Sequence, residues 1–295
     1  MELSAVIRRT AAGKQCCDFE GQIRGKRMIK RTISNFSLEQ IARSGQCFRM
    51  NQREEGVFEI LAGSRWLEAR QSGEACEFLC TEEEFSGFWE DYFDLKQDYG
   101  EYLSRIDEKD GYLSGAGRLA GGVRILRQEP WEMIVSFLIS QQNNIVRIRR
   151  CIENLCSAYG EPMQNGRGET YFAFPKPEAL AGLDEDALKA CNLGYRSRYV
   201  VRAAKRVAEG SFDLEAVAAL SYKEAKEELL TLFGVGVKVA DCICLFGLHH
   251  LEAFPVDTHI NQALEKHYGQ GFPMEKYEGI QGVIQQYIFY RELWG

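Results

Sequence analysis

Lys238 and Asp257 are the residues of this sequence whose types and spacing suggest chemistry most directly. Lys238 comes two positions after the tight turn Leu232-Phe233-Gly234-Val235-Gly236, and Asp257 follows it in Phe254-Pro255-Val256-Asp257-Thr258-His259. The partial positive charge of a helix N-terminus disfavours an ammonium ion, and so does partial burial, so both favour the free, nucleophilic amine. The pair therefore suggests an amine nucleophile with a carboxylate partner.

The turn before Lys238 also suits a phosphate group. Gly234 and Gly236 permit backbone conformations that a residue with a Cβ resists, and the apolar run Val239–Leu248 predicts a buried helix with Lys238 in its first turn. Exposed N–H groups at such a helix start can hold a phosphate oxygen without reading a base. This arrangement is typical of a site that acts on a nucleic-acid backbone.

Three blocks of the sequence share one signature. They are Leu-Phe-Gly-Val-Gly-Val-Lys-Val-Ala-Asp-Cys-Ile-Cys-Leu with the later Pro-Val-Asp-Thr-His, then Ser-Gly-Gln-Cys-Phe-Arg at 44–49, and Gly-Val-Arg-Ile-Leu-Arg-Gln-Glu-Pro at 122–130. Together they resemble the helix-hairpin-helix (HhH-GPD) DNA glycosylases, and within them the 8-oxoguanine DNA glycosylases, from about Ser37 to the last residue. One departure is Phe233, which stands where the family usually has proline. We expect it to alter the rigidity of the hairpin without loss of chemistry.

The resemblance implies a bifunctional DNA glycosylase and AP lyase of base-excision repair. Lys238 would attack C1′ of the damaged nucleotide as a neutral amine, displace the base and leave a Schiff base, from which β-elimination cuts the strand. Asp257 would cap the helix that begins at Thr258 and stabilise the positive charge developing on the sugar. The alternatives are that Lys238 only contacts phosphate and that Asp257 only caps.

Recognition of 8-oxoguanine depends on O8 and on a proton at N7, which guanine lacks. A backbone carbonyl facing N7 accepts from the lesion and rejects guanine by roughly 1–3 kcal/mol, and the resemblance assigns this carbonyl to Gly45. It assigns base reading and stacking to Gln285 and Phe289, one helical turn apart, and stacking on the opposite face to Cys242. From the residues alone, an ordinary turn at Gly45 and core packing of Phe289 and Cys242 remain alternatives.

The polar run 141–144 interrupts two apolar helices and suits a loop that enters the duplex once a base is flipped out. By resemblance Asn143 lines the vacancy, and Gln142 departs from the asparagine often found just before it. The resemblance gives further DNA contacts to Arg147 and Arg196 on the orphaned cytosine, Tyr195 as a wedge that kinks the duplex, and His259 on a phosphate. The arginine pair predicts cytosine as the preferred opposite base, and phosphate binding by both is the alternative.

The overall charge constrains where DNA could bind. The chain has 295 residues, a formal net charge of −7 and a sequence pI near 5.4, the wrong sign for a simple nucleic-acid-binding protein. If DNA is the partner, the charge must be distributed unevenly. Basic residues gather in two runs, each of which alone is typical of a solvated helix face: Arg8, Arg9, Lys14, Arg24, Lys26, Arg27, Lys30 and Arg31, and Arg147, Arg149, Arg150, Arg196, Arg198, Arg202, Lys205 and Arg206.

The ten cysteines, with no secretory signal, favour a reduced cytosolic interior over a disulfide framework. No cysteine follows Cys244, which excludes the iron–sulfur cluster that several glycosylases of this superfamily hold near the C-terminus. No apolar stretch approaches the roughly twenty residues that span a membrane. We expect no catalytic metal or cofactor, and the hairpin carbonyls leave room for a structural cation. We further expect a monomer that acts on double-stranded DNA containing 8-oxoguanine, cytoplasmic and nucleoid-associated in a bacterium or nuclear in a eukaryote.

Periodicity predicts an α+β fold with a helical majority. The expected divisions are a basic N-terminal arm over 1–31, an antiparallel β subdomain over 32–115 and a helical HhH-GPD glycosylase domain over 116–295. Strands are predicted at Cys47–Met50, Val57–Leu61 and Arg65–Glu68. Helices are predicted at Trp131–Gln141, Ile145–Tyr159, Pro177–Ala181, Ala187–Cys191, Arg198–Ala208, Tyr222–Leu232, Lys238–Gly247, Thr258–Tyr268 and Tyr277–Leu293.

Two other functions stay open on this sequence. A monofunctional alkyl-base glycosylase of the same fold would use the aspartate with water and lack the lysine, so Lys238 argues against it. A non-catalytic helix-hairpin-helix module would only tether a partner to DNA, and the lack of a linked second domain in the sequence weakens that interpretation.

Overall fold

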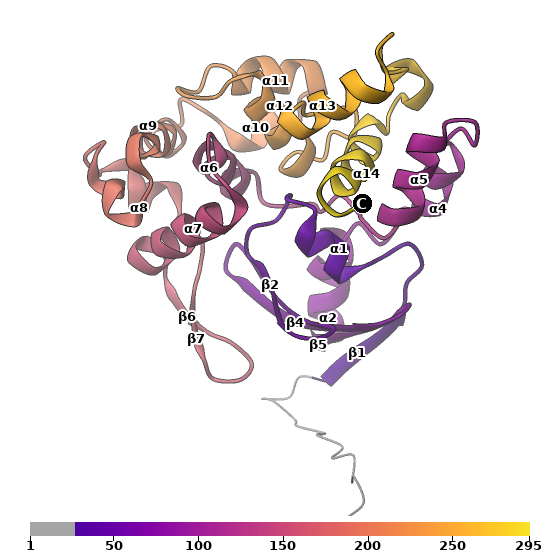
Figure 1. Cartoon of the computed structure of the whole chain (residues 1–295). Helices are drawn as coiled ribbons and strands as arrows, with labels where there is room; N and C mark the ends of the chain where they lie inside the picture. The colour runs from indigo at the N-terminus through magenta and orange to yellow at the C-terminus, as the bar shows by residue number, and fades with distance from the viewer. Residues whose placement is uncertain (1–26) are drawn as a thin grey trace, which may run out of the picture.

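The structure, a computed structural model, describes residues 27–295 as a curved sheet beneath a larger helical body (Figure 1). All five strands of the sheet pair antiparallel, in the order β1-β5-β4-β3-β2. They are β1 (Arg27–Thr32), β2 (Met50–Glu54), β3 (Val57–Ala62), β4 (Arg65–Ser72) and β5 (Ala75–Cys80). The predicted α+β fold is confirmed.

The helices fall into a group that follows the chain around the sheet and a group that builds the helical body. The first group is α1 (Leu38–Arg43), α2 (Glu82–Glu84), a π-helical turn (Phe85–Trp89), α3 (Glu90–Tyr92), α4 (Tyr99–Ser104) and α5 (Gly111–Ala120). The second is α6 (Pro130–Ser140), α7 (Ile145–Tyr159), α8 (Pro177–Ala181), α9 (Ser197–Ala208), α10 (Leu214–Ala218), α11 (Tyr222–Leu229), α12 (Val237–Phe246), α13 (Thr258–His267) and α14 (Gln281–Trp294). A small hairpin of β6 (Pro162–Gln164) and β7 (Thr170–Phe172) projects from the helical body beside the sheet (Figure 1).

Several predicted helices differ from the observed ones at their ends. Ile145–Tyr159 and Pro177–Ala181 are helices with the predicted bounds, whereas Ala187–Cys191 is a 3₁₀ helix. The predicted helix 277–293 is two elements, a 3₁₀ turn at Met274–Tyr277 and then α14, because Gly279 takes a positive φ of 81° that ends one and allows the next to begin.

The strand predicted at 47–50 is wrong except for its last residue. β2 begins at Met50, which belongs to the core of the sheet. Phe48 instead packs in the helical core, with its ring 5.8 Å from that of Phe137. Cys47 and Phe48 therefore direct their side chains into different cores, and this segment is not part of the sheet.

The predicted N-terminal arm ends earlier than expected, because Arg27–Arg31 belong to β1. Two basic side chains of this strand pair with acidic residues: Lys30 lies 2.9 Å from Glu77 of β5, and Arg31 pairs with Glu82 of α2. Neighbouring carboxylates therefore neutralise the charges of Lys30 and Arg31, the last two residues of this basic run. The rest of the predicted arm, residues 1–26, lies outside the described residues.

The predicted boundary at residue 115 falls inside α5. Ala116 and Ala120 of this helix are buried in the helical core, and the Arg291 side chain of α14 donates to the Tyr112 carbonyl. α5 therefore packs with the C-terminal helix, although it lies in sequence close to the sheet.

Two of the sequence blocks bind each other where the sheet meets the helices. The fully buried Gln46 donates to the Ser44 hydroxyl and to the Arg124 carbonyl, both at 2.8 Å, and its Oε1 accepts from the Leu126 N–H at 2.8 Å. Gln128 in turn donates to the Gln46 carbonyl at 2.9 Å. These bonds satisfy buried polar groups that would otherwise be costly, and they hold the neighbouring Gly45 in place.

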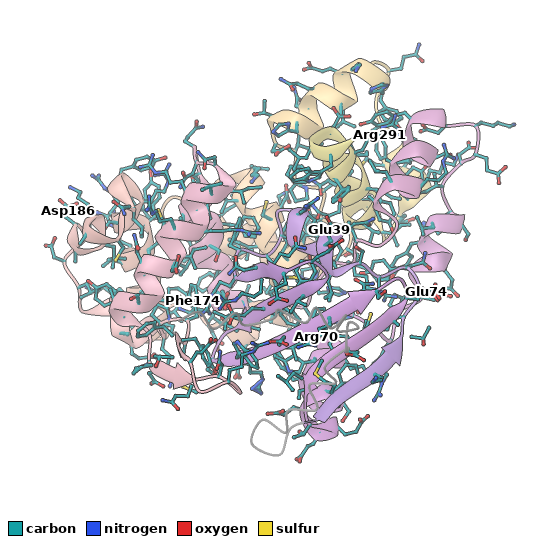
Figure 2. All side chains as sticks on the ribbon, turned by 60° about the horizontal axis from the view of Figure 1, so that its bottom comes forward. Glu39, Arg70, Glu74, Phe174, Asp186 and Arg291 are labelled. Atoms are coloured by element: carbon teal, nitrogen blue, oxygen red, sulfur yellow. The ribbon has the colours of Figure 1, made fainter. Side chains whose placement is uncertain are left out.

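A second buried polar cluster joins the sheet to α6 and the β6–β7 hairpin. Arg49 donates to the Gly63 carbonyl at 3.1 Å and to the Phe172 carbonyl at 2.5 Å, and lies 3.7 Å from the Glu132 carboxylate. Glu132 accepts from the Gly63 N–H at 2.9 Å. Phe174, which lies beside the sheet in Figure 2, donates its N–H to the Gly63 carbonyl at 3.0 Å.

Glu132 should make stability depend on pH. Burial raises the pKa of its carboxyl from 4.5 to about 7, which Arg49 only partly opposes. Because the pKa of Glu132 is higher in the folded protein than in the unfolded chain, its protonation stabilises the fold. This stabilisation is fully present at pH values below the unfolded-state pKa and is lost as the pH rises through the folded-state pKa. Urea unfolding should therefore show wild type losing about 3 kcal/mol relative to Glu132→Gln between pH 4 and pH 8. A wild-type advantage that grows with pH would mean that Glu132 is an ionised partner of Arg49.

Candidate active site and nucleic-acid interface

Lys238 lies directly after the hairpin that joins α11 to α12. The turn closes with a 3.0 Å hydrogen bond from the Val235 N–H to the Leu232 carbonyl. Gly236 is the N-cap of α12, and no side chain of the described residues caps this helix. Its first N–H groups therefore lack a side-chain acceptor, and the adjoining Val237 is 60% exposed. The helix start faces solvent with donors available to an anion.

The two glycines of the hairpin differ in what they require. Gly234 has φ +90°, and a Cβ there would lie 2.5 Å from the ring of Tyr199. Gly236 has φ −100° and ψ 176°, with no atom within 4 Å of a built Cβ. The expectation that both glycines relieve backbone strain is therefore wrong for Gly236, whose missing side chain instead leaves open space before α12.

The pair Gly234→Ala and Gly236→Ala separates these roles. Gly234→Ala should lower the free energy of unfolding by about 2 kcal/mol, because it adds both backbone strain and a clash with Tyr199. Gly236→Ala should cost less than about 1 kcal/mol and instead weaken binding to duplex DNA, because its methyl group stands where a phosphate would approach. Urea unfolding and duplex titration measure the two effects, and equal losses of stability would contradict the assignment.

Lys238, Cys242 and Asp257 share one small region. Burial raises the pKa of the Cys242 thiol to about 11, the nearby Lys238 lowers it and hydrogen-bonds the sulfur, and the Asp241 and Asp257 carboxylates raise it. Lys238 and Asp257 therefore both act on the same thiol. The Lys238 Nζ also lies 5.7 Å from the centre of the Phe137 ring, so the amine packs over an apolar surface. Their charges reach the same thiol from two different helix starts, Lys238 from α12 and Asp257 from α13.

Asp257 caps α13, as predicted from the sequence. Its Oδ1 accepts from the Ile260 N–H at 2.9 Å, which fixes the carboxylate at the helix start. The side chain is half-buried. One edge of the carboxylate is therefore held while the residue keeps partial access to solvent.

The residues predicted to read the base come from three elements that meet beside this pair. A Cβ built on Gly45, which has φ +75°, would lie 3.1 Å from Cε1 of Phe289, so the glycine is in close contact with the ring. The rings of His259 and Phe289 are 6.1 Å apart and nearly perpendicular. Gln285 is buried, and its amide donates to the Pro255 carbonyl at 3.0 Å. This bond ties α14 to the segment that carries Asp257.

The polar loop between α6 and α7 exposes a different residue from the one predicted. Asn143 turns inward, since its Nδ2 donates to the Ile139 carbonyl at 3.1 Å and its Oδ1 accepts from the Asn144 N–H. Gln142 is exposed at the tip, with φ +49°, and Asn144, also exposed, caps α7 by accepting from the Arg147 N–H. The geometry therefore favours Gln142 over Asn143 as the side chain that reaches outward.

Arg147 and Arg196 are predicted as a pair, but the structure places them differently. Arg147 is exposed on the first turn of α7. Arg196 is only 4% exposed, and its guanidinium donates to the carbonyls of Gln141 and of Gln142, the latter at 2.9 Å. Tyr195, 43% exposed, lies beneath the Arg196 guanidinium with its ring centre 4.5 Å away. In this structure Arg196 holds the polar loop, whereas Arg147 and Tyr195 face outward.

Comparison with known proteins accounts for both halves of the chain. A family model described as the 8-oxoguanine DNA glycosylase N-terminal domain matches residues 28–134, and one described as HhH-GPD superfamily base excision DNA repair protein matches residues 135–278. A probable N-glycosylase/DNA lyase of Methanothermobacter thermautotrophicus is 31% identical over 67% of this chain and 71% of its own length. The chain belongs to the 8-oxoguanine DNA glycosylase family.

Two further relatives support the membership. The crystal structure of the Clostridium acetobutylicum 8-oxoguanine glycosylase/lyase, in complex with double-stranded DNA containing cytosine opposite 8-oxoguanine, is similar with a TM-score of 0.85 and 34% identity, over 90% of this chain and 96% of that one. The N-glycosylase/DNA lyase of Saccharomyces cerevisiae is 37% identical over 50% of this chain, which spans 42% of the yeast protein.

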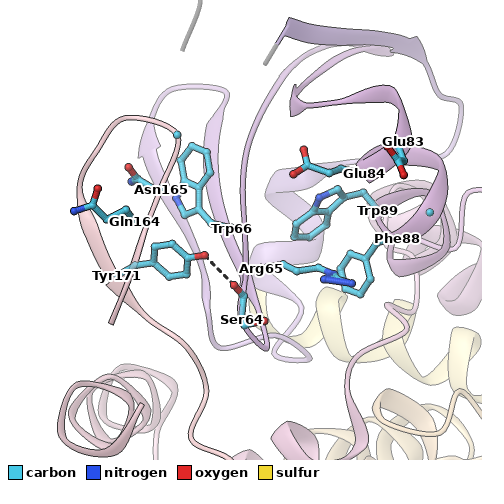
Figure 3. Close-up of a pocket in the computed structure, with 12 residues that line it drawn as sticks. Ser64, Arg65, Trp66, Glu83, Glu84, Phe88, Trp89, Gln164, Asn165 and Tyr171 are labelled. Carbon is cyan, nitrogen blue, oxygen red and sulfur yellow. Dashed lines mark hydrogen bonds between the residues drawn. The ribbon is translucent and has the colours of Figure 1, made fainter. Parts of the chain in front are cut away.

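One hollow of the surface is lined by none of the candidate site residues. It has a volume of about 460 Å³ and lies between the β3–β4 turn, the π-helical turn and the β6–β7 hairpin (Figure 3). Trp66 and Trp89 face it, and the Tyr171 hydroxyl closes one side by donating to the Ser64 carbonyl at 2.8 Å. None of the predicted site residues lines it, so the hollow is separate from the family's chemistry.

The structure adds no metal ligands to this picture. Among residues 27–295, no group of three or more His, Cys, Asp or Glu side chains is arranged to hold a metal ion. The Gly234 carbonyl of the hairpin already accepts from the Gln141 amide at 3.0 Å. In the same part of the chain, no helix is both long and apolar enough to cross a membrane.

Proposed function

We propose that this chain excises 8-oxoguanine opposite cytosine from double-stranded DNA and then cuts the strand through a lysine Schiff base. The observation that carries the proposal is the position of Lys238 at the start of α12, directly after a hairpin whose first helical N–H groups face solvent. The charge of Asp257, at the start of α13, acts on the same Cys242 thiol as Lys238. A phosphate on those N–H groups would bring the adjacent sugar toward the amine.

The reaction divides between the two residues. The free amine of Lys238 forms a bond to C1′, and the bond from C1′ to the base breaks with its electron pair leaving on the base. Asp257 stabilises the positive charge on the sugar as that bond breaks, and its cap bond to Ile260 keeps it in position. The ring then opens to the Schiff base, and loss of a proton from C2′ expels the 3′ phosphate.

The base pocket supports a choice of 8-oxoguanine over guanine. The Gly45 carbonyl would accept from N7–H, and it is held by the buried hydrogen bonds of Gln46. Phe289, in contact with Gly45, would stack on one face of the base, and Cys242 would stack on the other. With a pKa near 11, Cys242 is a neutral thiol at pH 7 and so presents an uncharged face. Gln285 would read the Watson–Crick edge, and His259 a flanking phosphate.

The opposite strand would meet the polar loop and the wedge. Gln142, at the exposed tip, would enter the space left by the flipped base in place of the predicted Asn143. Arg147 would donate to the acceptors of the orphaned cytosine, and Tyr195 would stack into the kinked duplex. Arg196 would contribute by holding the loop through its bonds to the Gln141 and Gln142 carbonyls.

The experiment that tests this function uses labelled duplexes with 8-oxoguanine opposite each of the four bases. We expect base loss and strand cutting to be fastest opposite cytosine, and Arg147→Ala to reduce that preference. Base loss without strand cutting would favour a monofunctional glycosylase. Binding without base loss would favour a tether, and an alkylated duplex serves as the control substrate for the first alternative.

The proposed function also includes expectations about cofactors, the oligomeric state and the cellular compartment. Neither step needs an iron–sulfur cluster or a catalytic metal, and the hairpin carbonyls could hold a structural cation. We expect the chain to act as a monomer, in the compartment that holds the chromosomal DNA.

A further inference from the structure

Three elements that face the DNA in the proposed function are joined by a series of aromatic contacts. The ring of Tyr199, on α9, lies 5.6 Å from that of Tyr195 and 5.3 Å from that of Phe233, and both pairs meet edge to face at 76°. Tyr199 therefore sits between the wedge residue and the hairpin. It also fills the space beside Gly234 that a Cβ would occupy.

Arginine side chains cover both ends of this series. The Arg196 guanidinium lies 4.5 Å from the centre of the Tyr195 ring, and that of Arg202 lies 4.2 Å from the Phe233 ring. Arg202 is itself fixed by Glu185, with its Nε 2.6 Å from Oε1. Edge-to-face rings and cations over ring faces are favourable arrangements, so each contact restrains the next.

The polar loop closes the series into a circuit. Arg196 donates to the carbonyls of Gln141 and Gln142, and the Gln141 amide donates back to the Gly234 carbonyl at 3.0 Å. The loop contacts the hairpin directly and the wedge segment through Arg196, and Tyr199 links the wedge to the hairpin. A displacement of one would disturb contacts to both of the others.

We infer that Tyr199 and Phe233 are positioning residues, which hold the wedge Tyr195 and the hairpin at a fixed separation before DNA binds. Phe233 stands where the family usually has proline, so the ring supplies a restraint on the hairpin that the proline ring would otherwise supply. Phe233 remains 46% exposed although it packs on Tyr199 and Arg202, so it borders the same outward face as Tyr195. Elements held in place beforehand lose less freedom on binding, which favours the complex.

This inference rests on the proposed function, and a double-mutant cycle tests it. Tyr195→Leu, Phe233→Leu and the double variant are compared with wild type in single-turnover cutting of an 8-oxoguanine:cytosine duplex. The half-saturating protein concentration should rise about 10-fold for Tyr195→Leu and about 5-fold for Phe233→Leu, yet only about 10-fold for the double variant, because the two changes break one coupled unit. The plateau rate at a pre-formed abasic site should change less than about 2-fold, because the chemistry at Lys238 is untouched.

Each outcome bears on the inference. A double variant weakened by the product of the single effects, about 50-fold, would overturn it, as would a Phe233→Leu variant with unchanged half-saturation. Phe233→Met, which also removes the ring but keeps an apolar side chain, replaces Phe233→Leu if that variant fails to fold, and the same non-additivity is expected. A wild type that leaves the lesion duplex intact would instead refute the proposed function.

Discussion

Replacing Lys238 with glutamine should abolish base release and strand cutting while leaving lesion binding intact. The amide cannot attack C1′ or form a Schiff base, so the single-turnover rate should fall by at least about 10³-fold. Glutamine can still pack over the Phe137 ring and donate to the Cys242 sulfur, so the surroundings of the site should survive. Single-turnover cutting and titration with a labelled 8-oxoguanine:cytosine duplex measure the two properties.

A second lysine provides the matched control. Lys223 is exposed on α11, one helix away from the site. Lys223→Gln makes the same chemical change without touching the amine beside Cys242, and its cutting rate should stay within about 2-fold of wild type. Cutting by Lys238→Gln at near the wild-type rate would remove the lysine from the mechanism.

Asp257 should prove more important for the reaction than for the fold. Asparagine can keep the cap bond to the Ile260 N–H but carries no charge, so Asp257→Asn should retain wild-type stability within about 0.5 kcal/mol. Its rate of base release should nevertheless fall by about 10²–10³-fold, because the charge on the sugar loses its stabilising partner. Thermal unfolding and single-turnover base release, measured on the same preparation, separate the two roles.

Two comparisons sharpen this prediction. Asp257→Ala should lose about 1 kcal/mol of stability in addition to the rate, because it removes the cap as well. Asp213 caps α10 with bonds to the Glu215 and Ala216 N–H groups, so Asp213→Asn makes the same change at a cap away from the site and should leave the rate unaltered. A full rate in Asp257→Asn would leave Asp257 with the cap alone.

The sequence predicted best those features that depend on local signals. Apolar periodicity placed α7 and α8 with their observed bounds, and the cap at Asp257 followed from its position before a helical stretch. β1 went unpredicted because its basic residues resemble a solvated arm, and their acidic partners Glu77 and Glu82 lie about fifty residues away. Pairing over such a distance leaves no periodic trace.

The candidate site likewise combines residues that local motifs predict with contacts that only the tertiary structure sets. The order of the motifs indicated Lys238, Cys242 and Asp257, and in the structure the charges of Lys238 and Asp257 both act on the Cys242 thiol. The direction of a loop side chain is set by tertiary hydrogen bonds, so the exposure of Gln142 and the inward turn of Asn143 could not be predicted. Likewise, the burial of Arg196 against loop carbonyls depends on a contact across 55 residues.

The central claim is that the Lys238 amine bonds to the sugar, and identification of the adduct tests it most directly. Wild-type protein is incubated with an 8-oxoguanine:cytosine duplex and borohydride, the covalent complex is digested, and the modified peptide is sequenced by mass spectrometry. We expect a reduced sugar adduct on Lys238 and on no other lysine. An adduct on a different amine, or base release with no adduct at all, would contradict it.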